Sequence, residues 1–357
     1  MIANNQKSIP LVDLQAQYLC IKPAIDAAIQ RVLNHTGFIL GKEVSDFEQS
    51  FAEFVHTKSS VGVASGTAAL RLALQACGVG PGDEVITTSH TFIATAEAIS
   101  QAGARPIFVD IDVNTYNIDP NCIEDALAKQ KKSRNKNRIR ALMPVHLYGR
   151  PANMKAITDI AQKYDLWVVE DAAQAHAAEI NGHRCGSIGH VGCFSFYPGK
   201  NLGAYGDAGI VTSNQGEIIT QIRRLRDHGR STKYIHQEIG WGERMDALQA
   251  SILGAKLPYL EDWTELRRKH ARTYTSLLNG IVITPSEDKD LRHVYHLYVI
   301  RTHDRDGLLA YLNSKNIGAS IHYPVPLHRQ PAYNFTEVQL PITEQTANEV
   351  LSLPMYP

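Results

Sequence analysis

The stretch FSFYPGKNLG at residues 194–203 decides how this chain is interpreted. An apolar run ends at Pro198 and Gly199, and Lys200 follows before a second glycine-rich stretch at residues 203–209. The aromatic and aliphatic neighbours would desolvate the Lys200 ammonium and lower its pKa. A lysine becomes a nucleophile able to form a Schiff base in this way. The alternative is an ordinary surface lysine after a turn, and these ten residues alone leave both open.

The composition excludes several classes of protein. The 357 residues include 36 Lys plus Arg and 36 Asp plus Glu, so the net charge is zero and no basic excess favours nucleic acid. We expect the basic run at 129–140 to be a solvated helix end and loop. The chain has no run of about 18 apolar residues, and its polar first ten residues do not resemble a signal peptide. Its five cysteines form no CxxC pair, which is typical of free thiols. We therefore expect a cytoplasmic protein with no nucleic acid and no membrane partner.

Short apolar strands alternate with amphipathic helices along most of the chain. This alternation predicts an α/β fold with a mainly parallel central sheet flanked by helices. Helical patterns at residues 11–33 and 43–55 precede the first strand pattern at 60–64. We expect a large domain over residues 1–245, which includes these helices, and a smaller C-terminal α+β domain over residues 246–357.

The first strand pattern leads directly into Ser65-Gly66-Thr67 and a helical run. Unpaired N–H groups and the dipole at a helix start attract an anion, glycine lets it approach, and the threonine hydroxyl adds a donor. Gly66 and Thr67 are therefore candidate phosphate ligands, and a capped helix is the alternative. Phe92 follows the next strand pattern, at the sheet edge where α/β proteins bind ligands. Its ring can stack on a planar cofactor or pack in the core.

A later strand pattern ends on two adjacent carboxylates, Glu170 and Asp171, and Gln174 lies three residues beyond. Since alternate strand residues face opposite ways, one carboxylate can face a site while the other turns aside. A buried carboxylate at this edge is costly unless it meets a cation or a strong donor. A protonated heteroaromatic nitrogen would serve.

Three other interpretations fail on spacing. Residues 199–201 lack the Ser or Thr of a P-loop, and residues 203–209 do not match the GxGxxG of a dinucleotide site. A set of possible metal ligands is spaced irregularly, so we predict no metal site. These possible ligands are His183, Cys185, His190 and Cys193.

The remaining candidates suit one cofactor. Pyridoxal 5′-phosphate (PLP) has a phosphate, a flat ring, a basic ring nitrogen and an aldehyde. Each group needs one of the candidate partners, and we therefore expect PLP to be the cofactor. These partners are the cradle at Gly66 and Thr67, the ring of Phe92, the acid Asp171 and the lysine Lys200.

From Ile9 to Pro357 the chain resembles the DegT-type, PLP-dependent aminotransferases that act on nucleotide-linked keto sugars. The resemblance implies the fold-type I (aspartate aminotransferase-like) architecture and a homodimer with active sites at the subunit interface. The blocks that carry it include ASGTAALRLAL, GPGDEVITTSHTFIATAEAI, VEDAAQAHAA, GCFSFYPGKNLGAYGDAG, RDHGRSTKY and ERMDALQASIL.

The resemblance also implies a role for each matched residue. Lys200 would hold PLP as a Schiff base and shuttle a proton, Asp171 would pair with the pyridinium nitrogen, and Gln174 would bond the phenolic oxygen. Phe92 would lie on the ring. The residues implied to hold the phosphate are Gly66, Thr67 and Ser195. The residues implied to contact the sugar nucleotide, partly from the neighbouring subunit, are Tyr197, Arg244, His322 and Tyr323.

One block departs from the family pattern. Relatives read Gly-x-Asn-x-Arg, and their Asn reaches across the dimer to the cofactor phosphate. This chain has Gly242 in place of that Asn. We expect the Gly242 backbone, a water or a nearby side chain to substitute for it.

Two residues define the expected substrate. Dehydratase relatives carry His in place of Lys200, so the lysine favours transamination. Relatives that aminate carbon 4 of the sugar often have His where this chain has Tyr197, which resembles the carbon-3 group acting on dTDP-linked 3-keto-6-deoxyhexoses. The expected reaction is ping-pong transamination from L-glutamate, with 2-oxoglutarate released and pyridoxamine 5′-phosphate as the intermediate form of the cofactor.

This reaction would yield a dTDP-3-amino-3,6-dideoxyhexose for amino-sugar biosynthesis. Three alternatives remain open. The enzyme could instead be a 3-aminotransferase on a UDP-3-keto-hexuronate or a 4-aminotransferase on a UDP-4-keto sugar. The third alternative is a catalytically silent regulatory protein of the same fold.

Overall fold

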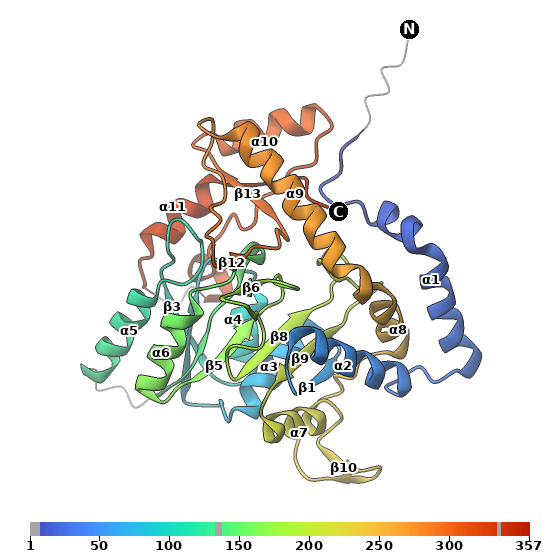
Figure 1. Cartoon of the computed structure of the whole chain (residues 1–357). Helices are drawn as coiled ribbons and strands as arrows, with labels where there is room; N and C mark the ends of the chain where they lie inside the picture. Colours follow the sequence, from blue (N-terminus) through green and yellow to red (C-terminus); the bar gives the residue numbers. More distant parts are fainter. Residues whose placement is uncertain (1–7, 133–137, 334–336) are drawn as a thin grey trace.

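A computed structural model of the chain describes residues 8–132, 138–333 and 337–357. Its centre is a seven-stranded sheet in the order β1-β9-β8-β5-β4-β2-β3 (Figure 1). Every neighbouring pair from β8 to β3 is parallel, whereas β9 runs antiparallel to both β8 and β1. The strands of this sheet are β1 Ser59–Val63, β2 Asp83–Thr88, β3 Arg105–Val109, β4 Arg138–Met143, β5 Trp167–Asp171, β8 Val191–Ser195 and β9 Gly209–Ser213.

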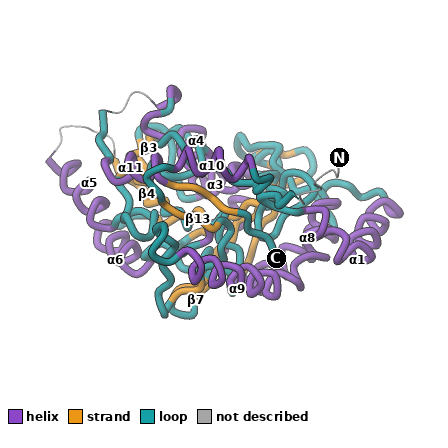
Figure 2. The backbone as a smooth tube through the Cα atoms, turned by 90° about the horizontal axis from the view of Figure 1, so that it is seen from above, coloured by secondary structure: helices purple, strands orange, loops and turns teal. Residues whose placement is uncertain are grey.

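Helices cover both faces of this sheet, with α5 and α6 towards one end of the molecule and α1 and α8 towards the other (Figure 2). The alternation of side chains along β8 explains the two layers. Val191 and Cys193 join the apolar cluster formed with α3 and α7, whereas Phe194 joins the cluster with α2 and α8. The helices are α1 Leu14–His35, α2 Lys42–Val55, α3 Gly66–Ala76, α4 Ala94–Gln101, α5 Pro120–Lys132, α6 Met154–Tyr164, α7 Gly216–Leu225, α8 Ala247–Lys256, α9 Leu260–Leu278, α10 Arg305–Ser314 and α11 Pro341–Glu349.

Smaller sheets join distant parts of the chain. β13 pairs with β14, β12 pairs with the β6–β7 hairpin, and the β10–β11 hairpin extends from the body at the bottom of Figure 1. Their bounds are β6 Glu179–Ile180, β7 His183–Arg184, β10 Arg230–Thr232, β11 Ile235–His236, β12 Leu291–Arg292, β13 Tyr298–Arg301 and β14 Val350–Leu353. The division into domains at residues 245 and 246 stays a prediction. Residues 133–137 of the basic run lie outside the described residues.

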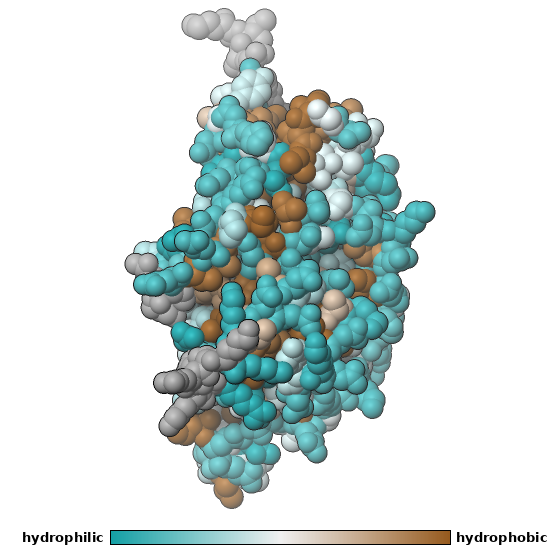
Figure 3. Space-filling view, turned by 90° about the vertical axis from the view of Figure 1, so that its left-hand side faces the viewer, coloured by the Kyte–Doolittle hydropathy of each residue, from teal (hydrophilic) through white to brown (hydrophobic). Residues whose placement is uncertain are grey.

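The surface seen in Figure 3 is mostly hydrophilic, with hydrophobic residues scattered over it. Among the described helices, none combines the length and the apolar composition needed to cross a membrane.

A buried ion pair fastens α2 to the sheet. Glu48 of α2 accepts a hydrogen bond from Gly62 N of β1 at 2.8 Å and pairs with Arg226, the residue after α7. Arg226 also donates to the Gly62 carbonyl, and both charged side chains are buried. The pair therefore joins three elements at one edge of the sheet.

We expect Glu48→Gln to lower the free energy of unfolding by about 3 kcal/mol, because it leaves the Arg226 charge buried without its anion. Urea denaturation measures this loss. The control is Asp46→Asn on the same helix, which removes an exposed pair with Lys42 and should leave the unfolding midpoint nearly unchanged. Equal stability of Glu48→Gln and the parent protein would contradict this account.

Candidate active site

Lys200 lies in a tight turn that follows β8. Its backbone N donates to Tyr197 O at 2.8 Å. Gly203 closes the turn against Pro198, since a Cβ at Gly203 would lie 2.2 Å from the Pro198 carbonyl oxygen. Only glycine fits this approach, so the sequence around Lys200 fixes the place from which its side chain starts.

The environment of Lys200 favours a neutral amine. The side chain is partly buried, and burial lowers its pKa to about 8, although the nearby charge of Asp171 acts in the opposite direction. Within the described chain its ammonium makes no hydrogen bond and no ion pair. A lysine in this state is available as a nucleophile.

Asp171 is buried at the carboxyl end of β5. Thr95 Oγ1 of α4 donates to its Oδ2 at 2.8 Å, and Ala173 N donates to its Oδ1 at 3.2 Å. Burial raises the pKa of this carboxyl despite these donors and the charge of Lys200. Among the residues described, no cation bonds the carboxylate, so Asp171 can accept a ligand that brings a positive charge or a strong donor.

The start of α3 meets the end of β8 beside this turn. Ser65 Oγ caps α3 by accepting from Ala68 N at 3.1 Å. A Cβ added to Gly66 would lie 2.6 Å from Ser195 Cβ, so glycine is required for this contact. Thr67 and Ser195 are both partly exposed next to it. Unpaired N–H groups, the dipole of an 11-residue helix and two hydroxyls fit a phosphate.

The rings of Phe92 and Tyr323 and the side-chain amide of Gln174 lie together on another side of the candidate site. Gln174 Oε1 accepts from Tyr148 N at 2.6 Å, and Gln174 Nε2 donates to Tyr323 Oη at 3.1 Å. The Tyr323 ring lies 5.9 Å from the ring of Phe92, which is 54% exposed. Tyr148 Oη also donates to the carbonyl of His322. The structure thus brings together the predicted residues Phe92, Gln174, His322 and Tyr323.

Three predicted residues remain, and the first of them, Tyr197, lies in the Lys200 turn, where its carbonyl accepts from Lys200 N. Tyr197 is 60% exposed. Arg244 pairs with Asp227 at 3.3 Å, and a Cβ on Gly242 would lie 3.1 Å from Cε1 of His228. Within the described ranges, no hydrogen bond or ion pair joins Gly242 or Arg244 to Lys200, and their predicted roles stay predictions.

Sequence reasoning missed the residues that support this site. Thr95 orients Asp171, and Tyr148 links Gln174 to His322. His176 is fully buried against Phe194 and Phe196, with both ring nitrogens unpaired among the described groups. Burial, with the charge of Lys200, lowers the pKa of His176 to about 3, so its imidazole is neutral. The one sequence signal for His176 is its position inside the VEDAAQAHAA block.

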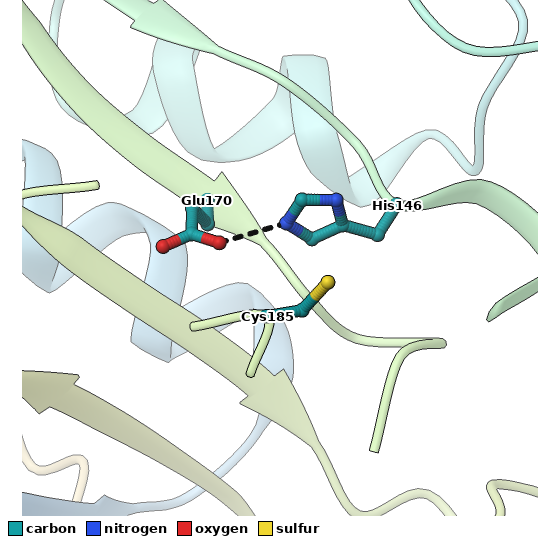
Figure 4. A group of neighbouring side chains, drawn as sticks. All are labelled: His146, Glu170 and Cys185. Atoms are coloured by element: carbon teal, nitrogen blue, oxygen red, sulfur yellow. Dashed lines mark hydrogen bonds and ion pairs between the residues drawn. The ribbon is translucent and has the colours of Figure 1, made fainter. Parts of the chain in front are cut away.

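A buried cluster of His146, Glu170 and Cys185 has the residue types of a metal site (Figure 4). The lone pairs of its Glu170 and His146 are already used. Glu170 accepts from His146 Nε2 at 2.9 Å and from the backbone N of Gly186, Ile188 and Gly189, and His146 Nδ1 accepts from Ala152 N. The cluster is therefore a hydrogen-bonded support for the end of β5. It also turns Glu170 away from Asp171, in line with the alternation expected along the strand.

Over residues 19–357 the sequence matches the DegT/DnrJ/EryC1/StrS aminotransferase family. This chain belongs to that family. Its fold is fold-type I, and the predictions of an aminotransferase and of PLP as the cofactor are confirmed. The lysine, buried acid, phosphate cradle and aromatic wall described above fit that cofactor.

Several named relatives match nearly the whole chain. A dTDP-3-amino-3,4,6-trideoxy-α-D-glucose transaminase of Streptomyces venezuelae is 43% identical over 98% of this chain and 91% of its own. A UDP-2-acetamido-2-deoxy-3-oxo-D-glucuronate aminotransferase of Pseudomonas aeruginosa is 42% identical over 98% of this chain and 94% of its own. A pleiotropic regulatory protein of Geobacillus stearothermophilus is 46% identical over 98% of this chain and 94% of its own.

Solved structures show the same architecture. S. venezuelae DesV in complex with a ketimine intermediate superposes with a TM-score of 0.93 at 42% identity. The match covers 98% of this chain and 94% of DesV.

In protein stripped of cofactor, we expect the Lys200 amine to react with an amine-acylating reagent at a half-maximal rate near pH 8 instead of the ordinary lysine value of 10.5. Asp171→Asn should move this midpoint to lower pH, because removing the negative charge disfavours the ammonium. Peptide mass spectrometry identifies the modified lysine. A midpoint near 10.5, or an upward shift in Asp171→Asn, would contradict the assignment.

Proposed function

We propose that this protein transfers an amino group from L-glutamate to a dTDP-linked 3-keto-6-deoxyhexose, with Lys200 as the catalytic base. The observation that carries the proposal is the placement of Lys200 in the turn after β8, next to the strand β5 that ends on the buried acid Asp171. Burial lowers the pKa of this lysine to about 8. Nucleotide-linked keto sugars are the substrates in the names of the Streptomyces and Pseudomonas relatives. Tyr197, which lies in the same turn as Lys200, favours a 3-keto sugar substrate through the family resemblance.

Bound PLP supplies an electron sink for the pair of electrons left on the substrate carbon. The neutral amine of Lys200 takes the proton from that carbon and releases it again later in the reaction. Asp171, fixed by Thr95 and Ala173, holds the proton of the ring nitrogen. The start of α3 with Ser195 holds the phosphate, while Phe92 and Gln174 position the ring.

A UDP-linked 3-keto-hexuronate is the second candidate substrate, because the Pseudomonas relative names a UDP-linked 3-oxo-glucuronate. A UDP-4-keto sugar is less favoured, since Tyr197 stands where carbon-4 relatives often have His. A silent regulatory protein of the same fold has no need of Lys200 or Asp171. Both residues are present with their supporting contacts, which favours turnover although the Geobacillus relative is named as regulatory.

We infer that the working unit is a homodimer in the cytoplasm. Apolar side chains are exposed near the site and on the β10–β11 hairpin, including Phe92, Tyr197, Tyr234, Ile235 and Ile239. A second copy would cover them and bring Gly242 and Arg244 to the neighbouring site.

The experiment supplies the protein with PLP, L-glutamate and one keto sugar at a time, and identifies products by NMR. We expect the dTDP-3-keto-6-deoxyhexose to give an amino sugar with stoichiometric 2-oxoglutarate, and Lys200→Ala to give none while still binding the nucleotide. Amination of the UDP-4-keto sugar alone would overturn the carbon-3 assignment. Turnover by Lys200→Ala at the parent rate would overturn the mechanism.

A further inference from the structure

A second lysine, which the proposed mechanism does not use, is buried in α8. Lys256 is 1% exposed, and among the described residues no carboxylate pairs with it. Burial lowers the pKa of its ammonium to about 8, so the group is mainly charged at neutral pH. Lysines are rarely buried to this extent without a paired charge, because removing a cation from water is costly. The contacts that Lys256 makes must offset this cost.

These contacts fasten the turn at residues 197–203 that carries Lys200. Lys256 Nζ donates to Gly203 O at 2.7 Å and, at a longer distance of 3.3 Å, to Gln17 Oε1 of α1. The ammonium also lies 4.1 Å from the centre of the Tyr205 ring, whose negative face attracts a cation. The shortest of these contacts is therefore made to the backbone of the turn, three residues after Lys200.

The other hydrogen bonds of the turn leave this carbonyl without a donor. Lys200 N donates to Tyr197 O at 2.8 Å, and Ala204 N donates to Phe196 O at 2.8 Å. Both bonds close the backbone around the turn, but neither involves the carbonyl of Gly203, which is a buried residue. A buried carbonyl is costly to leave unpaired. The orientation of the Gly203 peptide thus depends on the buried ammonium.

We propose that Lys256 is a positioning residue that acts through Lys200. Its ammonium, bound to the Gly203 carbonyl, fixes the turn from which Lys200 reaches the substrate carbon. The inference rests on the proposed function, in which Lys200 moves the proton. Proton transfer requires the carbon and the amine at a short and aligned distance, so a small displacement of the amine lowers the rate strongly.

The test follows the half-reaction of the holoenzyme with L-glutamate alone, through the absorbance of the cofactor. Lys256→Met keeps the length of the side chain and removes the charge and the donor. We expect its rate at saturating glutamate to fall about tenfold or more, with a change of less than about twofold in the glutamate concentration that gives half of this rate. The isotope effect with glutamate deuterated at the α-carbon should rise, because proton transfer then limits the rate.

Lys22→Met is the matched control. Lys22 also lies over a tyrosine ring, at 5.4 Å, but it is exposed and pairs with Asp26. Its rate and isotope effect should equal those of the parent. Lys256→Gln, whose neutral side chain is one atom shorter, is the second variant should Lys256→Met not fold, and we expect the same kinetic change. The parent isotope effect in a folded Lys256 variant, whatever its melting temperature, would overturn the inference.

Hydrogen exchange of the cofactor-free protein separates this inference from the proposed function. The amides of Lys200 and Ala204 are hydrogen-bonded in the parent and should exchange about fivefold faster or more in Lys256→Met, with no change in α6. If they do so but L-glutamate does not convert the cofactor of the parent, the hold on the turn stands and the proposed function fails. If the parent aminates the keto sugar and Lys256→Met keeps the parent exchange and kinetics, the positioning role fails and the function stands.

Discussion

The burial of one carboxylate, Asp171, is the constraint on which the site depends. It stands at the carboxyl end of a central parallel strand, where the ends of neighbouring strands meet. Two neutral donors fix its direction, but neither supplies the positive charge that a buried carboxylate calls for. The neighbouring Glu170 is held elsewhere by His146 and by three backbone N–H groups. Of these two acids, the fold therefore leaves only Asp171 able to bind a cationic ligand.

The remaining parts of the site are placed by close backbone approaches. Gly66 lets the start of α3 touch Ser195, and Gly203 closes the turn that carries Lys200. Tyr148 joins the segment after β4 to Gln174 and to His322 near the end of the chain. Elements that are far apart in the sequence thus converge on one site, and under the proposed function each would supply a partner for a different group of the cofactor.

The sequence predicts the parts of this site that lie in contiguous motifs. Lys200 follows a strand and Asp171 ends one, each in a recognisable block, and the sheet, cofactor class and family are as predicted. The supporting contacts were missed because Thr95, Tyr148 and His176 meet their partners only through the tertiary structure. β4 ends at Met143 although mainly apolar residues continue to Leu147, since Leu147–Gly149 turns with Tyr148 at a φ of 59°. No local sequence pattern shows that the side-chain amide oxygen of Asn117 accepts a hydrogen bond from Leu147 N at the start of this turn.

The most direct test of this account is the protonation state of the ring nitrogen of bound PLP. The measurement is ¹⁵N NMR of the protein reconstituted with PLP labelled at that nitrogen, in the parent chain and in Asp171→Asn. We predict a protonated nitrogen in the parent chain at neutral pH and an unprotonated one in the variant, because only the carboxylate stabilises the positive charge. An unprotonated nitrogen in the parent, or the same chemical shift in both proteins, would contradict the role given to Asp171.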